Sequence, residues 1–479
     1  MSSSERFDIS ISNLRVRYPD RDSDALVGFS EAIAEGEVVA VAGPSGCGKT
    51  TLSRTLAGFI PSMIPAVVTG EVCLGGNSIR GAAPEALATR IGMVQQDPDA
   101  QICTLSAWQE VAFGPENLCL PASEVRSRVE RCLAELGIAH LSDRITTTLS
   151  GGEKQRLAIA SILAMEPSVL LFDEPTANLD PRGIQALFAT LSGLVHGEKR
   201  TLVIIEHRID ALRALAPRVV LLDRGRTVLR YPARERIDYA DVGLRGQWAV
   251  PASPGPGGPA RVTVDRVSFG YDEPLWRDLS FTLREGEVLA VIGPNGGGKT
   301  SLLRLIAGLA APQTGAIRCA AQTRTGFVFQ HPHHQIFERT VRKEMQLEGP
   351  RDEESLDAGL LEARLGGLEN AAPLSLSLGE QRRLTVATAL ARSPNLLLLD
   401  EPFIGQDRRN VLWVISRLRD RVAAGGTAIV VTHDIPLAAA LADRVLYLDR
   451  GVFLLGSPDD VFRRLRDLGE GAFTPEAWS

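Results

Sequence analysis

The chain has 479 residues, which is too long for one ordinary hydrophobic core and fits two domains. Apolar residues make up 44% and charged residues 23% of the sequence, so the composition excludes a wholly disordered chain. The formal net charge of −6 gives the protein no electrostatic basis for coating nucleic acid.

The sequence predicts neither a membrane helix nor a secretory signal. No apolar run reaches the roughly 18 residues that a membrane helix needs, and the N-terminal segment MSSSERFDIS lacks a basic stretch followed by an apolar one. The six cysteines form no C-x-x-C pair, and five of them lie in the first half. This argues against a disulfide framework or a zinc site and fits a soluble protein in a reducing cytosol.

The first chemical motif follows an apolar, strand-like run. The segment VVAVAGPSGCGKTTL at 38–52 contains the pattern G-x-x-x-x-G-K-T. Glycines in such a loop let backbone N–H groups turn inward around phosphate oxygens, while Lys49 neutralises phosphate charge and the Thr50 hydroxyl reaches Mg²⁺. Cys47 is either a thiol whose pKa is lowered by a helix N-terminus or a small filler residue. The predicted ATP-binding residues are Gly43, Pro44, Ser45, Gly46, Cys47, Gly48, Lys49, Thr50 and Thr51.

A second motif ends a run of strand length. The segment VLLFDEP at 169–175 is predicted to be a buried central strand of a parallel sheet, followed by two carboxylates. Such carboxylates emerge at the carboxyl edge of the sheet, where ligands bind. We expect Asp173 to hold Mg²⁺ and Glu174 to orient and deprotonate the attacking water.

The segment PASPGPGGPA at 251–260 has no periodicity and is rich in residues that break helices and strands. We predict a first domain at 1–240, a linker at 241–260 and a second domain at 261–479. Beyond the linker the same motifs return in the same order, as VLAVIGPNGGGKTSL at 288–302 and LLLLDEP at 396–402. The chain is therefore an internal repeat of two domains.

The second copy is expected to have the same chemistry. Asp400 would hold Mg²⁺ together with Thr300, and Glu401 would act on the attacking water. The predicted ATP-binding residues of this copy are Gly293, Pro294, Asn295, Gly296, Gly297, Gly298, Lys299, Thr300 and Ser301.

Between these motifs lie LSGGE at 149–153 and LSLGE at 376–380, each predicted to start a helix, at 155–164 and 381–391. With these segments the chain resembles the ABC ATPase family over nearly its whole length. The resemblance implies two α/β P-loop NTPase domains, each with a mostly parallel sheet core, an antiparallel β subdomain and a helical signature subdomain. It also implies that each signature caps ATP on the opposite domain, so that both ATP sites form within one chain. The signature residues are Ser150, Gly151, Gly152, Ser377, Leu378 and Gly379.

Other positions match the family residue by residue. The resemblance implies that a tyrosine stacks on adenine, a glutamine reaches Mg²⁺ and the water, an aspartate links the two sites, and a histidine contacts the γ-phosphate. A strand tyrosine and a structural histidine are the alternatives. The matching residues are Tyr18, Gln96, Asp180 and His207 in the first copy and Tyr271, Gln330, Asp407 and His433 in the second.

The glutamine segments indicate the kind of ABC ATPase. They read QDPDAQ at 96–101 and QHPHHQ at 330–335, and this Q-x-P-x-x-Q pattern resembles the ATPases of energy-coupling factor (ECF) importers and of related cobalt or nickel systems. The resemblance implies uptake of a vitamin, a vitamin precursor or a transition-metal ion. It also implies a transmembrane coupling protein and a substrate-binding membrane protein as partners, at the cytoplasmic face of the membrane. A fused sugar-importer ATPase and a twin ABC ATPase acting on ribosomes are the alternatives.

The two copies differ at two places. Leu378 stands where the family has glycine, so we expect it to remove backbone freedom and add bulk near one γ-phosphate, unless it points away. The second glutamine segment carries His331, His333 and His334, whereas the first carries Asp97 and Asp99. These histidines are either solvated loop residues or ligands of a transition metal.

Overall fold

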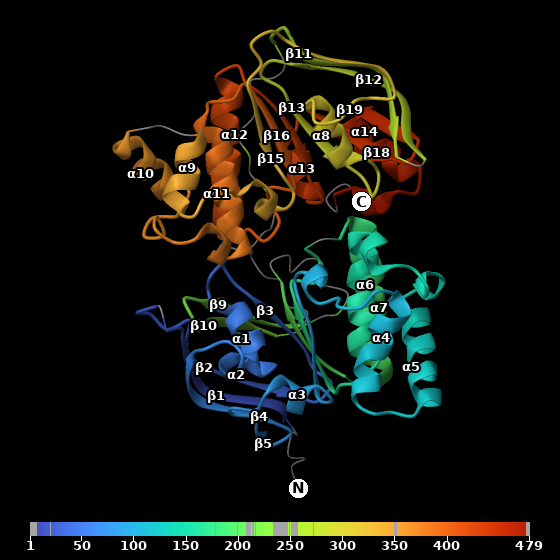
Figure 1. Cartoon of the computed structure of the whole chain (residues 1–479), viewed down its shortest axis with the longest axis vertical. Helices are drawn as coiled ribbons and strands as arrows, with labels where there is room; N and C mark the ends of the chain where they lie inside the picture. The colour runs from blue at the N-terminus through green and yellow to red at the C-terminus, as the bar shows by residue number, and fades with distance from the viewer. Residues whose placement is uncertain are drawn as a thin grey trace. The chain divides into compact units, whose positions relative to one another are not determined.

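The structure is a computed structural model of the whole chain. It describes residues 7–19, 21–177, 179–198, 200–206, 212, 215, 217–232, 248, 250, 257–271, 273–348 and 352–475. The chain divides into two compact units, of which the first comprises Met1–Leu179 and Gly183–Gly246 and the second comprises Asp180–Arg182 and Gln247–Ser479. In Figure 1 the N-terminal elements are coloured blue to green and the C-terminal ones yellow to red.

The first unit contains an antiparallel sheet with the strand order β2-β1-β4-β5. Ile9 and Ile11 are buried, a register shift follows, and burial resumes at Leu14 and Val16. Asn13, with φ 49°, lies in this irregularity, so one face of the strand stays apolar on both sides of it. The strands are β1 (Phe7–Arg17), β2 (Leu26–Ala34), β4 (Val67–Leu74) and β5 (Asn77–Ser78).

A six-stranded sheet with the order β10-β9-β3-β8-β7-β6 forms the centre of the first unit. All its pairs are parallel except β9 with β10. Val39 and Val41 pack into one hydrophobic core and Ala40 and Ala42 into another, so this sheet is covered on both faces, as its unbroken apolar strands predict. The strands are β3 (Val38–Ala42), β6 (Ile91–Val94), β7 (Val169–Asp173), β8 (Thr201–Ile205), β9 (Arg218–Asp223) and β10 (Arg226–Tyr231).

Two helices of the first unit, α4 and α6, begin at serine caps. Ser106 and Ser150 each start a helix with a capping box, closed by Gln109 and Glu153 respectively. The helices α4 and α5 both pack against α6. The helices are α1 (Lys49–Leu56), α2 (Phe59–Ser62), α3 (Pro84–Leu87), α4 (Ala107–Asn117), α5 (Ala122–Glu135), α6 (Gly151–Leu163) and α7 (Pro181–Glu198).

The second unit repeats this architecture. Its antiparallel sheet has the order β12-β11-β14, and its central sheet has the order β15-β16-β17-β13-β18-β19, parallel except for β18 with β19. The strands are β11 (Ala260–Gly270), β12 (Pro274–Arg284), β13 (Val288–Ile292), β14 (Thr314–Cys319), β15 (Thr325–Val328), β16 (Leu396–Asp400), β17 (Thr427–Val431), β18 (Arg444–Asp449) and β19 (Val452–Gly456). The helices are α8 (Lys299–Ile306), α9 (Val341–Glu348), α10 (Glu353–Glu362), α11 (Leu378–Ala391), α12 (Arg408–Ala423), α13 (Ile435–Leu441) and α14 (Pro458–Asp467). The expected fold class is thus confirmed in each unit.

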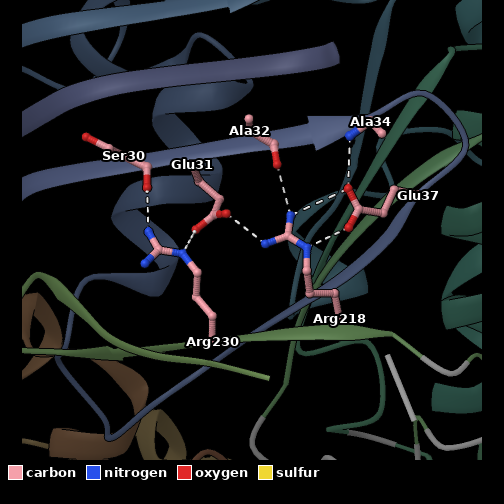
Figure 2. A network of polar contacts seen from close by, with 7 residues as sticks. All are labelled: Ser30, Glu31, Ala32, Ala34, Glu37, Arg218 and Arg230. Carbon is pink, nitrogen blue, oxygen red and sulfur yellow. Dashed lines mark hydrogen bonds and ion pairs between the residues drawn. The ribbon is translucent and has the colours of Figure 1, made fainter. Parts of the chain in front are cut away.

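An arginine cluster joins the two sheets of the first unit (Figure 2). Arg218 on β9 reaches Glu37 at 2.6 Å and Glu31 at 2.7 Å, and Arg230 on β10 reaches Glu31 at 2.9 Å. The Glu31 side chain is only 7% exposed, so these ion pairs are partly desolvated. In the second unit Arg444 contacts Glu287 at 3.0 Å, which fixes the corresponding strands.

None of the helices in the described part of the chain has both the length and the apolar composition needed to cross a bilayer.

Candidate nucleotide sites

The first phosphate loop lies between the carboxyl end of β3 and the start of α1. Gly43 has φ 153° and Gly48 has φ 108°. A Cβ at these positions would lie 2.1 Å from Leu222 O and 2.4 Å from Ala25 O, so only glycine fits. The buried Lys49 ammonium donates to Gly43 O at 2.9 Å and to Pro44 O at 3.0 Å, which keeps it inside the loop.

The second loop has the same construction between β13 and α8. Lys299 donates to Gly293 O at 2.9 Å and to Pro294 O at 2.8 Å. A Cβ at Gly298 would lie 2.4 Å from the Trp276 indole nitrogen. Burial lowers the pKa of Lys299, while nearby carboxylates, Glu401 first among them, oppose that shift. The remaining predicted residues lie in these same two turns or in the first turn of the helix that follows each of them.

Cys47 is buried in the first loop. Burial raises the pKa of its thiol, and the nearby Lys49 ammonium opposes this effect without overcoming it. The possibility that the helix N-terminus lowers this pKa is therefore wrong. A filler residue, 3% exposed, is what the structure supports.

The two aspartates that end the central strands lie beside their phosphate loops. Thr300 Oγ1 donates to Asp400 Oδ2 at 2.7 Å, whereas in the first unit Ser53 Oγ, one turn further along α1 than Thr50, donates to Asp173 Oδ2 at 3.2 Å. Burial, followed by the charge of Glu174, raises the pKa of Asp173 to about 6.

Both aspartates have features that suit a divalent cation. In each, Oδ1 is buried without a hydrogen-bond partner among the described residues. A buried carboxylate oxygen with a free lone pair, next to a loop built for phosphate, is a ligand that Mg²⁺ prefers. The donor sets around Asp173 and Asp400 therefore fit this ion.

The glutamates after these aspartates occupy a strained turn. Glu174 has φ 48° and Glu401 has φ 51°, which are unusual values for residues other than glycine. Their amides donate to β8 and β17, at Ile205 O and Val431 O, over 2.9 and 3.0 Å. These bonds hold both side chains at the carboxyl edge of the sheet.

The described residues show one side-chain partner for each glutamate. Gln96 Nε2 donates to Glu174 Oε2 at 2.8 Å. Glu401 instead lies against His433, whose Nε2 is 3.2 Å from Glu401 Oε1. Burial raises the pKa of Glu401 to about 8, and the Lys299 ammonium opposes that rise. The structure thus joins the predicted glutamate to the predicted glutamine in one unit and to the predicted histidine in the other.

The predicted adenine-stacking tyrosines lie next to the loops. The Tyr18 hydroxyl is 3.1 Å from Thr51 Oγ1, and the Tyr271 hydroxyl is 3.3 Å from Ser301 Oγ. Tyr271 is 66% exposed and packs edge-on against Phe269, with ring centroids 5.3 Å apart. An exposed ring beside a phosphate loop can receive a planar base.

The signature segments cap helices that begin earlier than predicted. The helix α6 begins at Gly151, not at Gln155, and α11 begins at Leu378, not at Gln381. Ser150 and Ser377 cap them and pair with Glu153 and Glu380. These S-x-x-E capping boxes were legible in the sequence.

Leu378 requires a correction. It lies in the first turn of α11, and neither it nor Gly151, the residue at the same place in α6, has a positive φ. Glycine's freedom is therefore not needed at this position, and the expected loss of backbone freedom is wrong. Leu378 is half-buried, so only its bulk distinguishes it from glycine.

The other predicted positions are placed as follows. Asp180 is half-buried and directly precedes α7, while Asp407 caps α12 by accepting the Asn410 amide at 2.8 Å. His207 lies outside the described residues. Gln330 ends the loop after β15, where its carbonyl accepts a hydrogen bond from Arg382 at 3.0 Å.

The glutamine segments continue into short 3-10 turns, at Pro98–Ala100 and Pro332–Gln335. Lys154 on α6 forms an ion pair with Asp99, which offsets part of the acidic character of the first segment. The histidine rings of the second segment are exposed, with centroids 4.3 to 5.6 Å apart. Across the described ranges, no group of three or more His, Cys, Asp or Glu side chains is arranged to hold a metal ion.

Sequence reasoning missed two buried glutamates that anchor the loops after these segments. Glu110 Oε2 accepts the Thr104 amide at 2.9 Å, and Glu344 Oε2 accepts the Phe337 and Glu338 amides at 2.9 and 2.7 Å. Both glutamates are almost fully buried. The signal was a carboxylate in the first turn of each following helix.

Comparison with known proteins agrees with this geometry. The family model described as ABC transporter matches residues 26–177 and 276–404. A protein of Methanosarcina acetivorans, provisionally designated an ABC transporter ATP-binding protein, is 32% identical over 98% of this chain and 88% of its own length. YkoD of Bacillus subtilis, provisionally designated an HMP/thiamine import ATP-binding protein, is 33% identical over 95% of this chain and 92% of its own. The archaeal ribosome recycling factor aABCE1 shares the fold, with a TM-score of 0.66 at 22% identity over 95% of this chain and 92% of that one.

Proposed function

The chain belongs to the ABC transporter family, with two ATP-hydrolysing domains, and on that premise we propose that it energises an ECF-type importer. The observation that carries this proposal is the Q-x-P-x-x-Q segment in both copies, together with similarity to YkoD over almost the whole chain. The designation of that relative points to HMP or thiamine as cargo. The proposal also includes another vitamin or a transition-metal ion as the transported cargo.

Each pocket has the groups needed for hydrolysis by water. On ATP binding, Lys299 would exchange its two loop carbonyls for phosphate oxygens, which are stronger acceptors. Glu401 would orient the attacking water and accept its proton, with His433 beside it to contact the γ-phosphate. Tyr271 would stack on the base.

Mg²⁺ would be held by Thr300, Asp400 and Gln330 in the second pocket and by Thr50, Asp173 and Gln96 in the first, where it would neutralise charge on the transferred phosphate. In the first pocket Lys49, Glu174 and Tyr18 would take the other roles. His207, and the completion of each pocket by the signature of the other domain, remain predictions from the family resemblance.

The proposal includes membrane subunits docking beside the glutamine segments, which would place the protein at the cytoplasmic face of the membrane. Leu105 and Phe337, which closely follow the two segments, are each 77% exposed. We propose that these two side chains contact the membrane subunits. The carboxylates anchoring both loops would hold these side chains in place.

The test is uptake by cells that express the chain with its membrane subunits, supplied with labelled thiamine, its pyrimidine precursor, Co²⁺ or Ni²⁺. We expect ATP-dependent accumulation of one class of cargo, and we expect the double variant Glu174→Gln, Glu401→Gln to abolish it. Each single variant, assayed for ATP turnover, also tests whether the Leu378 signature makes the pockets unequal. Equal losses in the two single variants would count against unequal pockets.

Affinity purification of the chain from membranes separates the alternatives. Recovery of a transmembrane coupling protein and a small substrate-binding membrane protein supports the ECF assignment. Recovery with sugar-importer subunits, or co-sedimentation with ribosomes, would replace it with the corresponding alternative.

A further inference from the structure

The signature helix of the second unit carries a buried arginine that touches two parts of the nucleotide site. Arg382 lies in the second turn of α11 and is 4% exposed. One guanidinium nitrogen donates to the main-chain carbonyl of Glu401, and the other donates to the carbonyl of Gln330 at 3.0 Å. A single planar group therefore ties the turn after β16 to the loop after β15.

Among the described residues of the first unit, no such link is made from the equivalent place. Counting from the signature serine, the position of Arg382 in α11 is that of Gln155 in α6. Gln155 is 1% exposed, and its Nε2 has no hydrogen-bond partner among the described residues. Glutamine carries both of its N–H donors on one nitrogen and has no charge, so it cannot span two separate carbonyls as the guanidinium fork does.

We propose that Arg382 is a positioning residue that makes the glutamine loop and the catalytic turn of the second unit move as one body. The inference rests on the proposed roles of Gln330 and Glu401. A change in the glutamine loop on docking of a membrane subunit would reach Glu401 through this guanidinium. The first pocket lacks the link, so its glutamate responds to its own loop mainly through the contact between Gln96 and Glu174.

A neighbour on the same helix provides a matched control. Arg383 is also buried, at 8% exposure, and its Nε donates to a main-chain carbonyl, Ala363 O, at 2.9 Å. That carbonyl belongs to the C-terminal cap of α10, which is part of neither the glutamine loop nor the turn after β16. Arg383→Gln therefore removes a buried arginine of the same type without cutting the proposed link.

The experiment measures ATP hydrolysis by the purified full chain in a Glu174→Gln background, in which the second pocket is expected to carry out the hydrolysis. We expect Arg382→Gln to lower kcat about 10- to 100-fold with KM for ATP changed less than about threefold, because misplacing a catalytic group costs rate more than binding. Arg382→Lys should restore part of the rate, since one ammonium can hold one carbonyl. Arg383→Gln should leave kcat within about threefold.

Hydrogen exchange gives a readout that does not depend on activity. Amides of 330–337 should exchange faster in Arg382→Gln than in Arg383→Gln. Equal kcat or equal exchange in the two glutamine variants would overturn the proposal, as would a kcat unchanged by Arg382→Gln. If Arg382→Gln fails to fold, Arg382→Lys replaces it in the comparison. Its kcat must then be lower, and its amide exchange at 330–337 faster, than those of Arg383→Gln. Residual hydrolysis in a chain with both Glu174→Gln and Glu401→Gln would instead refute the proposed catalytic roles. A chain that hydrolyses ATP but supports no uptake with its membrane subunits would refute the proposed importer function.

Discussion

Replacing Glu401 by glutamine should stabilise the second domain, and the gain should increase with pH. Glu401 is 3% exposed, and burial raises its pKa from 4.5 to about 8. Between these values the folded chain keeps a proton that the unfolded chain has released, so the free energy of unfolding falls as pH rises. At 1.36 kcal/mol per unit this costs about 3 kcal/mol at about pH 7 and about 5 kcal/mol above pH 8, with the opposing effect of the Lys299 ammonium already included in that pKa.

Thermal unfolding of the nucleotide-free protein in a chelator tests this prediction. In a domain of this size about 3 kcal/mol corresponds to a rise in Tm of about 6–12 °C. We expect Glu401→Gln to show a rise of about that size at about pH 7, a larger rise at about pH 9 and almost none at about pH 5. Glu174→Gln is the matched control, because Glu174 is only half-buried and accepts a hydrogen bond from Gln96. A pH-independent difference, or a lower Tm for Glu401→Gln, would refute the reasoning.

Three further predictions concern binding and stability. Lys299→Ala should weaken ATP binding to the second pocket about 10- to 100-fold by removing charge-assisted bonds to phosphate, measured by calorimetry with the first pocket disabled. Tyr271→Ala should raise the KM for ATP about tenfold while Tyr271→Phe keeps it, since the ring does the stacking; equal effects would implicate the hydroxyl instead. Arg218→Ala should lower the stability of the first domain by about 1–3 kcal/mol in chemical unfolding, because Glu31 loses one of its two arginines and Glu37 its ion pair with Arg218, and an unchanged midpoint would contradict this.

The parts of the site that follow from local sequence were predictable. An apolar run of strand length followed by G-x-x-x-x-G-K-T fixes both the strand and the loop, because any side chain at Gly43 or Gly48 would collide with neighbouring carbonyls. The carboxylates after β7 and β16 were predictable for a similar reason, since parallel strands end at one edge of a sheet.

The partners of those carboxylates were not predictable, because packing between distant segments selects them. Asp173 is hydrogen-bonded to Ser53 in the first unit, whereas the matching Asp400 is bonded to the loop threonine Thr300. Glu401 is paired with His433, and Glu174 accepts a hydrogen bond from Gln96. Such choices depend on differences of a few ångströms in side-chain placement, which the spacing of residues along the chain does not encode.

The left-handed backbone of Glu174 and Glu401 has a consequence for anyone who evolves this protein for heat resistance. Asparagine and glycine adopt that conformation more readily than glutamate, and at position 401 neither buries a carboxyl. A screen that selects only for thermal stability would therefore enrich replacements at both positions. It would recover chains that are more stable but lack the carboxylates proposed for ATP hydrolysis. Library design should hold these two codons constant and seek its gains elsewhere in the fold.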